Sequence, residues 1–362
     1  MVSSQNLLTT PFRSFSMGGY ECTDQLNCFG NRVDFLHLTG HGQLQAEDYK
    51  QLHPFNIRTV REGIRWSQVE KRAYQYDWTT VSDMIDTGKA CGIQQLWDIC
   101  HFGFPDDLTP LHPMFARRFA ALCQAFVHFY RSKNPDETLI VTPVNEVSFL
   151  SWLGGDSVGT APYCNKQGWE VKYGLMRAYI EGTAAMKEID PNIKIMSTEP
   201  LVNMVPPLNA NKDMIRRAKE AHEHQFQAMD ILCGRTCPEL GGSPAYLDLL
   251  GLNHYYNNQW VFGSGNFFAL GKRTLRRALA TPAQPPARSL QPLPDPAPII
   301  RNQSSERRPA PLDPVYRQRM CGPDRYEHPV RGRMPLSDHR PARLGSSYPL
   351  APGRFMGCGT GG

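Results

Sequence analysis

Short apolar segments alternate with longer amphipathic segments along residues 14–256, and this alternation constrains the fold more than any other feature of the chain. The apolar segments, each expected to form a β-strand, cover residues 14–19, 56–66, 93–102, 138–146, 192–200 and 245–256. The segments expected to be helical cover residues 46–54, 79–92, 113–133, 169–189 and 211–229. Strands that alternate with helices in this way predict a parallel sheet with right-handed crossover connections.

Two architectures fit this alternation, an open doubly wound sheet and a (β/α)8 barrel. No G-x-G-x-x-G motif follows residues 14–19, which weakens the case for a nucleotide-binding doubly wound sheet. The barrel is favoured because polar residues stand at or just after the end of each expected strand, where barrel enzymes carry their chemistry. These residues are Glu21, Gln25, Arg61, His101, Asn145, Glu146, Glu199, Asn253 and Tyr255. We therefore expect an α/β fold of the (β/α)8 TIM-barrel type that is incomplete, with six β/α units.

Residues 271–362 have a different composition from the rest of the chain. They hold 16 of the 30 prolines, and 16 Lys and Arg against 6 Asp and Glu, so this segment carries a net charge of +10 and residues 1–270 carry −5. Proline at this density removes backbone donors and disfavours helices and central strands. We expect residues 1–270 to form one catalytic-type domain and residues 271–362 to form a Pro/Arg-rich tail outside any packed core. Two origins stay open: a native tail that contacts acidic partners, or out-of-frame translation of GC-rich coding sequence.

The sequence also sets expectations for location and for bound groups. No stretch approaches the ~20 consecutive apolar residues of a membrane-spanning helix, and residues 1–13 lack the pattern of a secretory signal. Ten cysteines in such a chain suggest free thiols in the cytoplasm. Cys233 and Cys237 have no partner set at zinc-ligand spacing, so we expect neither a metal nor another cofactor. The net negative charge of residues 1–270 gives no reason to expect nucleic acid as a partner.

Four segments resemble a known family in its own order. TPVNE (142–146) is similar to the Asn-Glu signature of the large clan of retaining glycoside hydrolases with (β/α)8 barrels. REGIRW (61–66), CHFGFPDDL (100–108) and GLNHYY (251–256) resemble segments of family 1 glycoside hydrolases, the β-glucosidase type. Phe102 replaces the family's tryptophan, and His254 replaces its first tyrosine. The resemblance covers about residues 14–260 and implies hydrolysis of a small or oligosaccharide β-glycoside.

The resemblance also implies roles for individual residues. Retaining hydrolysis uses two carboxyl groups about 5–5.5 Å apart, one as acid/base and one as nucleophile. Glu146 matches the acid/base, and Asn145 matches the residue that hydrogen-bonds the sugar 2-hydroxyl. His101 resembles a ligand of the sugar hydroxyls, and either Gln25 or Glu21 matches the family's sugar-binding glutamine.

Three further residues match positions around the nucleophile. Arg61 lies where the family places an arginine against that carboxylate, and Tyr255 matches the tyrosine whose hydroxyl touches it. Asn253 matches a neighbouring polar contact. Trp66, Trp97 and Trp152 are candidates for stacking on sugar faces, although interior packing is the commoner role of a tryptophan.

The nucleophile itself has no match. In the family it is a glutamate at the end of the seventh strand, but residues 257–362 offer only Glu306 and Glu327, and no strand-like run precedes either one. Glu199 ends the fifth expected strand, so the family order does not assign it this role. We therefore expect impaired hydrolysis. Two alternatives stay open, a non-catalytic sugar-binding protein and binding of acidic partners through the tail.

Overall fold

A seven-stranded parallel sheet forms the centre of the computed structural model, which describes residues 10–255, 258–263, 267–268 and 299–303. Its strand order is β1-β2-β3-β4-β5-β7-β10, and each neighbouring pair is parallel. The strands are β1 (Gly18–Gly19), β2 (Thr59–Gly63), β3 (Gln94–Cys100), β4 (Ile140–Val144), β5 (Lys194–Pro200), β7 (Leu249–His254) and β10 (Ile299–Gln303). The six strands predicted from the sequence are all present, in chain order.

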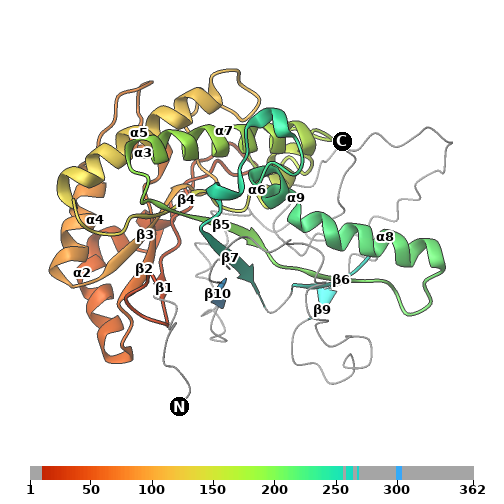
Figure 1. The fold of residues 1–362 in the computed structure, drawn as a ribbon, viewed down its shortest axis with the longest axis horizontal. Coiled ribbons are helices and arrows are strands. Elements are labelled where there is room, and N and C mark those ends of the chain that lie inside the picture. The colour runs from red at the N-terminus through yellow and green to blue at the C-terminus, as the bar shows by residue number, and fades with distance from the viewer. Residues whose placement is uncertain (1–9, 256–257, 264–266, 269–298, 304–362) are drawn as a thin grey trace, which may run out of the picture.

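Helices cover the outer face of this sheet (Figure 1). They are α1 (Phe35–Leu38), α2 (His41–Leu52), α3 (Trp66–Val69), α4 (Thr79–Ala90), α5 (Phe115–Lys133), α6 (Val147–Gly155), α7 (Gly168–Ile189), α8 (Lys212–Glu223) and α9 (Gln227–Leu232). Short 3-10 turns cover His53–Phe55, His224–Phe226, Pro238–Leu240 and Pro244–Tyr246. The predicted helix over 113–133 is α5, and its residues Phe119, Leu122 and Phe126 are each 0% exposed and belong to the main hydrophobic cluster.

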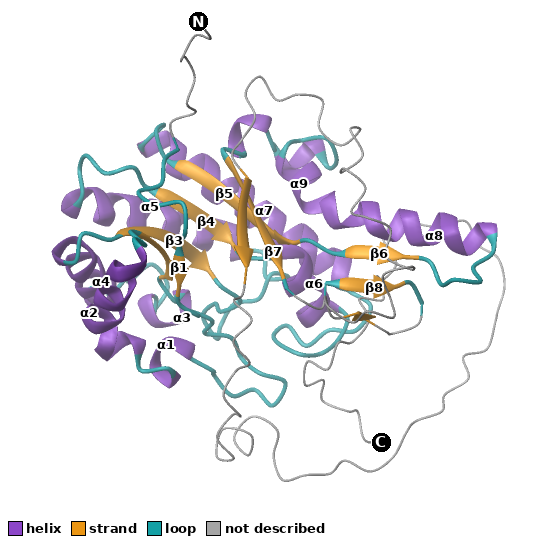
Figure 2. Cartoon of the chain, turned by 90° about the horizontal axis from the view of Figure 1, so that it is seen from below, coloured by secondary structure: helices purple, strands orange, loops and turns teal. Residues whose placement is uncertain are grey.

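The inner face of the sheet carries a separate layer of side chains. Leu96, Ile140, Met196 and Leu249 come from β3, β4, β5 and β7 and form one buried cluster, against which Phe12 and Met17 pack. One residue from each neighbouring strand at a common level is the packing of a barrel interior. The sheet is therefore a curled half-barrel of the (β/α)8 type (Figure 2).

Element ends differ from the prediction in several places. The helix expected over 79–92 is α4, which ends at Ala90, and its N-cap Trp78 makes no side-chain cap hydrogen bond within the described residues. The expected helix over 211–229 is divided into α8 and α9 by a 3-10 turn at His224–Phe226. Helix α6 was not predicted. Only Asn145 and Glu146 separate it from β4, and neither is a glycine or proline that would mark the change of period.

Strand β10 corrects the prediction for the C-terminal segment. Ile299–Gln303 pairs with β7 in parallel register, with Ile299 beside Leu250 and Gln303 beside His254. The unpaired edge of β7 offers backbone donors and acceptors that a short β-branched run such as Ile299–Ile300 can satisfy. A strand therefore does precede Glu306, which lies outside the described residues. The division into 1–270 and 271–362 otherwise stays a prediction.

A second, smaller sheet lies beside α8. It contains β6 (Asn203–Val205), β8 (Gln259–Val261) and β9 (Phe267–Phe268), with β6 parallel to β8 and β9 antiparallel to β8. Seven cysteines of the described part are free thiols, as expected, whereas Cys28 is disulfide-bonded. Within the same part, no helix combines the length and apolar character needed to cross a membrane.

Candidate active site

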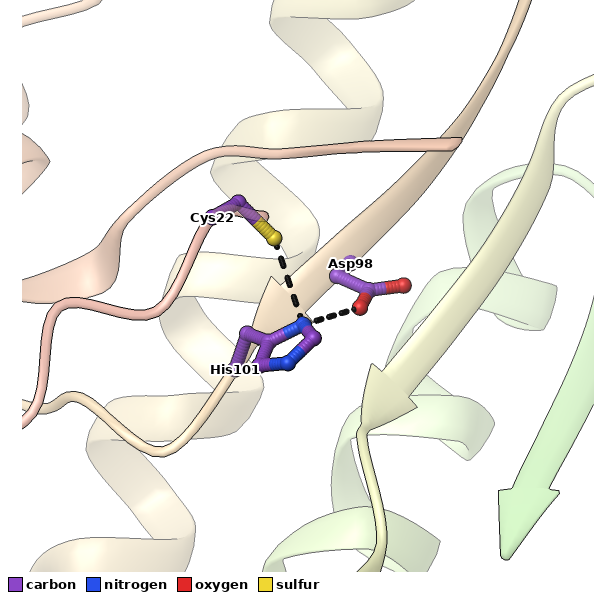
Figure 3. A group of neighbouring side chains, drawn as sticks. All are labelled: Cys22, Asp98 and His101. Carbon is purple, nitrogen blue, oxygen red and sulfur yellow. Dashed lines mark hydrogen bonds and ion pairs between the residues drawn. The ribbon is translucent and has the colours of Figure 1, made fainter. Parts of the chain in front are cut away.

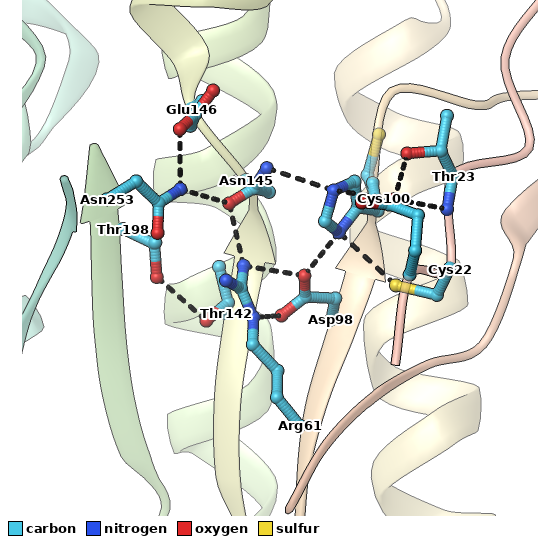
Figure 4. Close-up of polar contacts among 12 residues, drawn as sticks. Cys22, Thr23, Arg61, Asp98, Cys100, Thr142, Asn145, Glu146, Thr198 and Asn253 are labelled. Atoms are coloured by element: carbon cyan, nitrogen blue, oxygen red, sulfur yellow. Dashed lines mark hydrogen bonds and ion pairs between the residues drawn. The ribbon is translucent and has the colours of Figure 1, made fainter. Parts of the chain in front are cut away.

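Polar side chains from the ends of β2, β3 and β4 meet on the inner face of the sheet (Figure 4). Arg61 donates through Nε to Asp98 Oδ1 at 2.9 Å and through Nη2 to Asp98 Oδ2 at 2.7 Å. The same Nη2 donates to Asn145 Oδ1 at 2.6 Å. Asp98 lies two residues after Leu96, so both side chains project from the same face of β3. The Arg61 guanidinium therefore joins three strands at one level of the half-barrel.

Asn253 connects this group to Glu146. It projects from β7, and its Nδ2 donates to Glu146 Oε1 at 2.5 Å and to Asn145 Oδ1 at 3.4 Å. Asn253 is 3% exposed, and its Oδ1 is buried without a hydrogen-bond partner among the residues that the structure describes. An unsatisfied buried oxygen at this point is an acceptor available to a hydroxyl group of a ligand.

The backbone holds Glu146 where β4 turns into α6. Glu146 has φ 47° and ψ 61°, in the left-handed region that non-glycine residues rarely adopt, and its N–H donates to Thr198 O at 2.9 Å. Burial raises the pKa of the Glu146 carboxyl, and it outweighs the opposing effects of Asn253, His101 and Arg61. The carboxyl group thus keeps its proton to a higher pH than an exposed glutamate would.

His101 lies just after β3 and contacts residues on two sides. Its Nδ1 is 2.7 Å from Asp98 Oδ2 and 3.2 Å from Cys22 Sγ. Its Nε2 is 3.2 Å from Asn145 Nδ2 and 3.5 Å from Glu21 Oε1. Burial lowers the pKa of His101, but Cys22, Asp98 and Glu21 together raise it well above its ordinary value.

The loop after β1 carries the other candidate residues. Glu21 Oε1 accepts from the backbone N–H of Thr23 at 3.0 Å and from its hydroxyl. Partial burial raises the pKa of Glu21, but His101, Thr23 and Arg61 reverse the shift and hold it below the ordinary value. Glu21 is therefore the loop carboxylate that faces the strand-end group, through His101.

Gln25 and Tyr255 do not share these hydrogen bonds. Gln25 has a buried Oε1 with no hydrogen-bond partner among the described residues. Tyr255 is 45% exposed, and burial together with the nearby Glu146 and Glu21 raises the pKa of its hydroxyl to about 12. The structure thus joins Glu21, Arg61, His101, Asn145, Glu146 and Asn253, and leaves Gln25 and Tyr255 outside the hydrogen-bonded group.

Glu199 points in another direction. Thr198 lies on the inner face, where its hydroxyl is 3.3 Å from that of Thr142, so Glu199 projects toward the helices. Its Oε2 accepts from the N–H of Ser148 in α6 at 3.2 Å. Burial raises the pKa of Glu199 to about 7, while Ser148 and Lys172 act in the opposite direction. Glu199 therefore belongs to the layer between sheet and helices.

Aromatic rings form a row beside the polar group. The ring centroids of His101 and Phe102 are 4.9 Å apart, those of Phe102 and Phe149 are 5.4 Å apart, and those of Phe149 and Trp152 are 5.7 Å apart. Phe102, Phe149 and Trp152 are each half-buried. Trp66 and Trp97, two of the predicted sugar-stacking candidates, are instead 0% exposed and pack among the phenylalanines of α5.

Three side chains of the group offer metal-ligand atoms. Cys22, Asp98 and His101 each have one such atom within 4.8 Å of the others (Figure 3). However, Arg61 already binds both oxygens of Asp98, and its positive charge competes with a cation. Burial also raises the pKa of the Cys22 thiol to about 11, so it is not a thiolate near neutral pH. The arrangement fits a hydrogen-bonded cluster better than a divalent-metal site.

Asp98 is the main residue that the sequence reasoning missed. It stands inside the buried run QQLWDIC (94–100), where an ionised side chain is costly unless it is paired. The pKa of Asp98 is pulled up by burial, but Arg61 and His101 hold it below the ordinary value. An acidic residue between the apolar residues Trp97 and Ile99, three positions before a histidine, was the available signal.

The fold and the strand-end group define a (β/α)8-type half-barrel with a buried carboxyl at the end of its fourth unit. Neither protein-family models nor curated proteins match the sequence. Among solved structures, the chain is similar to the family 1 β-glucosidase from Thermotoga maritima (17% identity, TM-score 0.51) and to the β-glucosidase from Thermotoga maritima in complex with glucoimidazole (17% identity, TM-score 0.50).

Each similarity covers 59% of this chain and 54% of the other. The chain thus matches about half the length of these solved proteins. At 17% identity the likeness establishes the fold alone, and it agrees with the fold class predicted from the sequence.

Proposed function

We propose that this chain binds a β-glycoside on the inner face of the half-barrel and that Glu146 donates a proton to the glycosidic oxygen. The observation that carries the proposal is the buried Glu146 carboxyl, whose pKa is raised by burial at the end of β4. A general acid must start protonated near the working pH, and burial is the usual means of keeping a carboxyl group neutral. The similarity in fold to β-glucosidases supports the same choice of substrate class.

The residues around Glu146 offer the hydrogen-bonding and stacking contacts that a sugar can make. The free acceptor lone pair of Asn253 Oδ1 and the carboxylate of Glu21 are partners for sugar hydroxyl groups. Phe102, Phe149 and Trp152 form an aromatic surface next to these groups, on which the apolar face of a pyranose ring can stack. Hydrogen-bonding groups beside an aromatic surface match the two kinds of face that a sugar ring presents.

Proton donation by Glu146 breaks the bond between the anomeric carbon and the leaving oxygen, and the sugar then carries positive charge. In a retaining enzyme, a carboxylate about 5–5.5 Å from the acid attacks that carbon. Asp98 does not suit this role, because Arg61 and His101 occupy both of its oxygens. With no attacking carboxylate assigned, we expect slow hydrolysis in which water attacks the anomeric carbon and its proton passes to the Glu146 carboxylate, at a rate about 10²–10⁴-fold above the uncatalysed reaction.

The test is turnover of 4-nitrophenyl β-glucoside by the full chain, compared with its Glu146→Gln and Glu199→Gln variants. We expect Glu146→Gln to reduce the rate to that of the uncatalysed reaction while glucoside binding by calorimetry persists. Glu199→Gln is the matched control, because it changes a buried glutamate that faces the helices. Wild-type turnover should fall as pH rises through the raised pKa of Glu146. Equal rates for the wild type and Glu146→Gln would contradict the proposal.

A second candidate function is sugar binding without hydrolysis. The observation in its favour is that Arg61, matched by resemblance to the arginine beside the nucleophile, pairs with Asp98 of β3. If the wild type binds the glucoside and its turnover equals that of Glu146→Gln, this second function replaces the first.

A further inference from the structure

Four side chains of the strand-end group form a closed cycle of contacts. Asp98 contacts His101 Nδ1, and His101 Nε2 contacts Asn145 Nδ2. Asn145 Oδ1 accepts a hydrogen bond from Arg61 Nη2, which also donates to Asp98 Oδ2 and closes the cycle. The heavy-atom distances around the cycle are 2.7, 3.2, 2.6 and 2.7 Å. Asp98 is 1% exposed, and each of its oxygens is occupied. A buried polar network in which every member is satisfied fixes the orientation of its side chains.

The cycle determines where the protons lie. Arg61 has only donors, so the oxygen of the Asn145 amide must face it and the Asn145 amide N–H must face His101. Asp98 is ionised and only accepts, so His101 Nδ1 must carry a proton. Nε2 is then the one ring position whose protonation can change.

The two contacts of His101 Nε2 require opposite protonation states. At 3.2 Å, Asn145 Nδ2 donates to a bare Nε2, whereas Glu21 Oε1 at 3.5 Å needs an Nε2–H. The charged and titratable groups around the ring are Asp98 on β3, Arg61 on β2, Cys22 and Glu21 in the loop after β1, and Glu146 after β4. In both states Asp98 holds the proton at Nδ1.

We propose that Asp98 is a positioning residue. It keeps His101 protonated at Nδ1 and holds Arg61 and Asn145, so that His101 Nε2 faces the inner face of the half-barrel, where the proposed function places the sugar. The inference deepens the proposed function, since it assigns a role at the same site. Asp98 acts through its neighbours, in the way that a buried carboxylate fixes the tautomer of a histidine in other sites.

The principal test measures the tautomer of His101 by ¹⁵N NMR, with the His101→Gln variant to assign the signal. In the wild type above the pKa of His101, we expect a protonated Nδ1 and a bare Nε2, the reverse of the preference of free histidine. In Asp98→Asn, the new amide N–H faces Nδ1, so we expect the proton to move to Nε2. Asp48→Asn is the matched control, because Asp48 contacts His41 Nδ1 at 2.6 Å outside the site.

Binding of 4-nitrophenyl β-glucoside, followed by calorimetry, is the second readout. We expect Asp98→Asn to weaken it by about 10- to 100-fold, the effect of removing hydrogen bonds to a charged group. Asp190→Asn is the control for affinity and should leave it unchanged, because Asp190 pairs with Arg131 of α5 outside the site.

The outcomes separate this inference from the proposed function. A wild-type His101 with its proton on Nε2, or a tautomer unchanged in Asp98→Asn, overturns the positioning role whatever the glucoside does. If the tautomer moves and neither protein binds the glucoside, the positioning role stands and the proposed function fails. If Asp98→Asn does not fold, the wild-type tautomer alone decides the question.

Discussion

At the scale of single residues, Gly63 shows how closely the site loop packs on the sheet. It ends β2, and a Cβ atom placed there would lie 2.4 Å from Cys22 Sγ and 2.7 Å from Cys22 Cβ. We expect Gly63→Ala to lower the free energy of unfolding by about 1–3 kcal/mol and to weaken glucoside binding, because the loop with Glu21 must shift. Urea denaturation measures the first effect and calorimetry the second.

The control for this prediction is Gly42→Ala. Gly42 lies in α2, and a Cβ atom there would meet no atom within 4 Å. Alanine should raise the free energy of unfolding by about 0.5–1 kcal/mol, because glycine is the poorer helix former. Equal effects of the two substitutions would show that the loop does not resist displacement at Gly63.

His41 supports the same loop from the other face of the sheet. Its ring stacks on Tyr20 with centroids 3.6 Å apart, and its nitrogens contact Asp48 Oδ2 at 2.6 Å and Glu62 Oε1 at 3.1 Å. Burial lowers the pKa of His41, but Glu62 and Asp48 outweigh it and raise the pKa above the ordinary value. Tyr20 directly precedes Glu21, so this contact anchors the start of the site loop.

The raised pKa of His41 predicts a pH dependence of stability. The folded chain holds this proton more tightly than the unfolded chain does, so the stabilisation is fully present below about pH 6.5 and is lost as pH rises through the folded-state pKa. His41→Gln should therefore destabilise the chain more at pH 5.5 than at pH 9. Urea denaturation of both proteins at the two pH values tests this, and a difference independent of pH would show that the charge of His41 contributes nothing.

The sequence predicted which side chains meet at the site where the residues stand at strand ends, and it predicted less for residues within strands. Arg61, Asn145 and Asn253 come together because the ends of neighbouring parallel strands meet at one edge of a sheet. The pairing of Arg61 with Asp98 could not be read from the chain, because it depends on the register of β2 and β3. The resemblance places a carboxylate after a seventh strand beside Arg61, and no residue of the sequence was matched to it.

At the scale of elements, the packing of α5 into the main hydrophobic cluster can be tested by substitution. Leu122 on α5 is 0% exposed, and Leu44 on α2 is 50% exposed. Leu122→Ala should lower the free energy of unfolding by about 2–5 kcal/mol, because it leaves a cavity in the main cluster. The same substitution at Leu44 should change it by no more than about 0.5 kcal/mol. Comparable losses in urea denaturation would show that α5 does not carry the core.

Strong periodicity explains which elements were predictable. Strands β2, β3, β4 and β5 are mostly buried, and α5 has a regular apolar stripe. Helix α6 is separated from β4 by only two residues, Asn145 and Glu146, and β10 lies in a proline-rich segment that shows no period. The strand at Ile299–Gln303 depends on the free edge of β7, which is a tertiary feature that local sequence does not contain.

At the scale of the whole molecule, β10 divides the C-terminal segment into two parts that differ in what they contribute. Residues 299–303 form the strand that pairs with β7, whereas the sequence of residues 304–362 combines high proline content with no apolar period. The paired edge of β7 would otherwise present free backbone donors and acceptors to other chains.

Two shortened chains test this division. A chain that ends at Gln303 should unfold at the same urea concentration as the full chain and remain as soluble, because we expect residues 304–362 to lie outside the packed core. A chain that ends at Phe268 loses β10, and should show a lower midpoint and concentration-dependent aggregation through the exposed edge of β7. If the chain ending at Gln303 is destabilised as strongly as the chain ending at Phe268, residues 304–362 contribute to the core. The half-barrel would then need them for its stability.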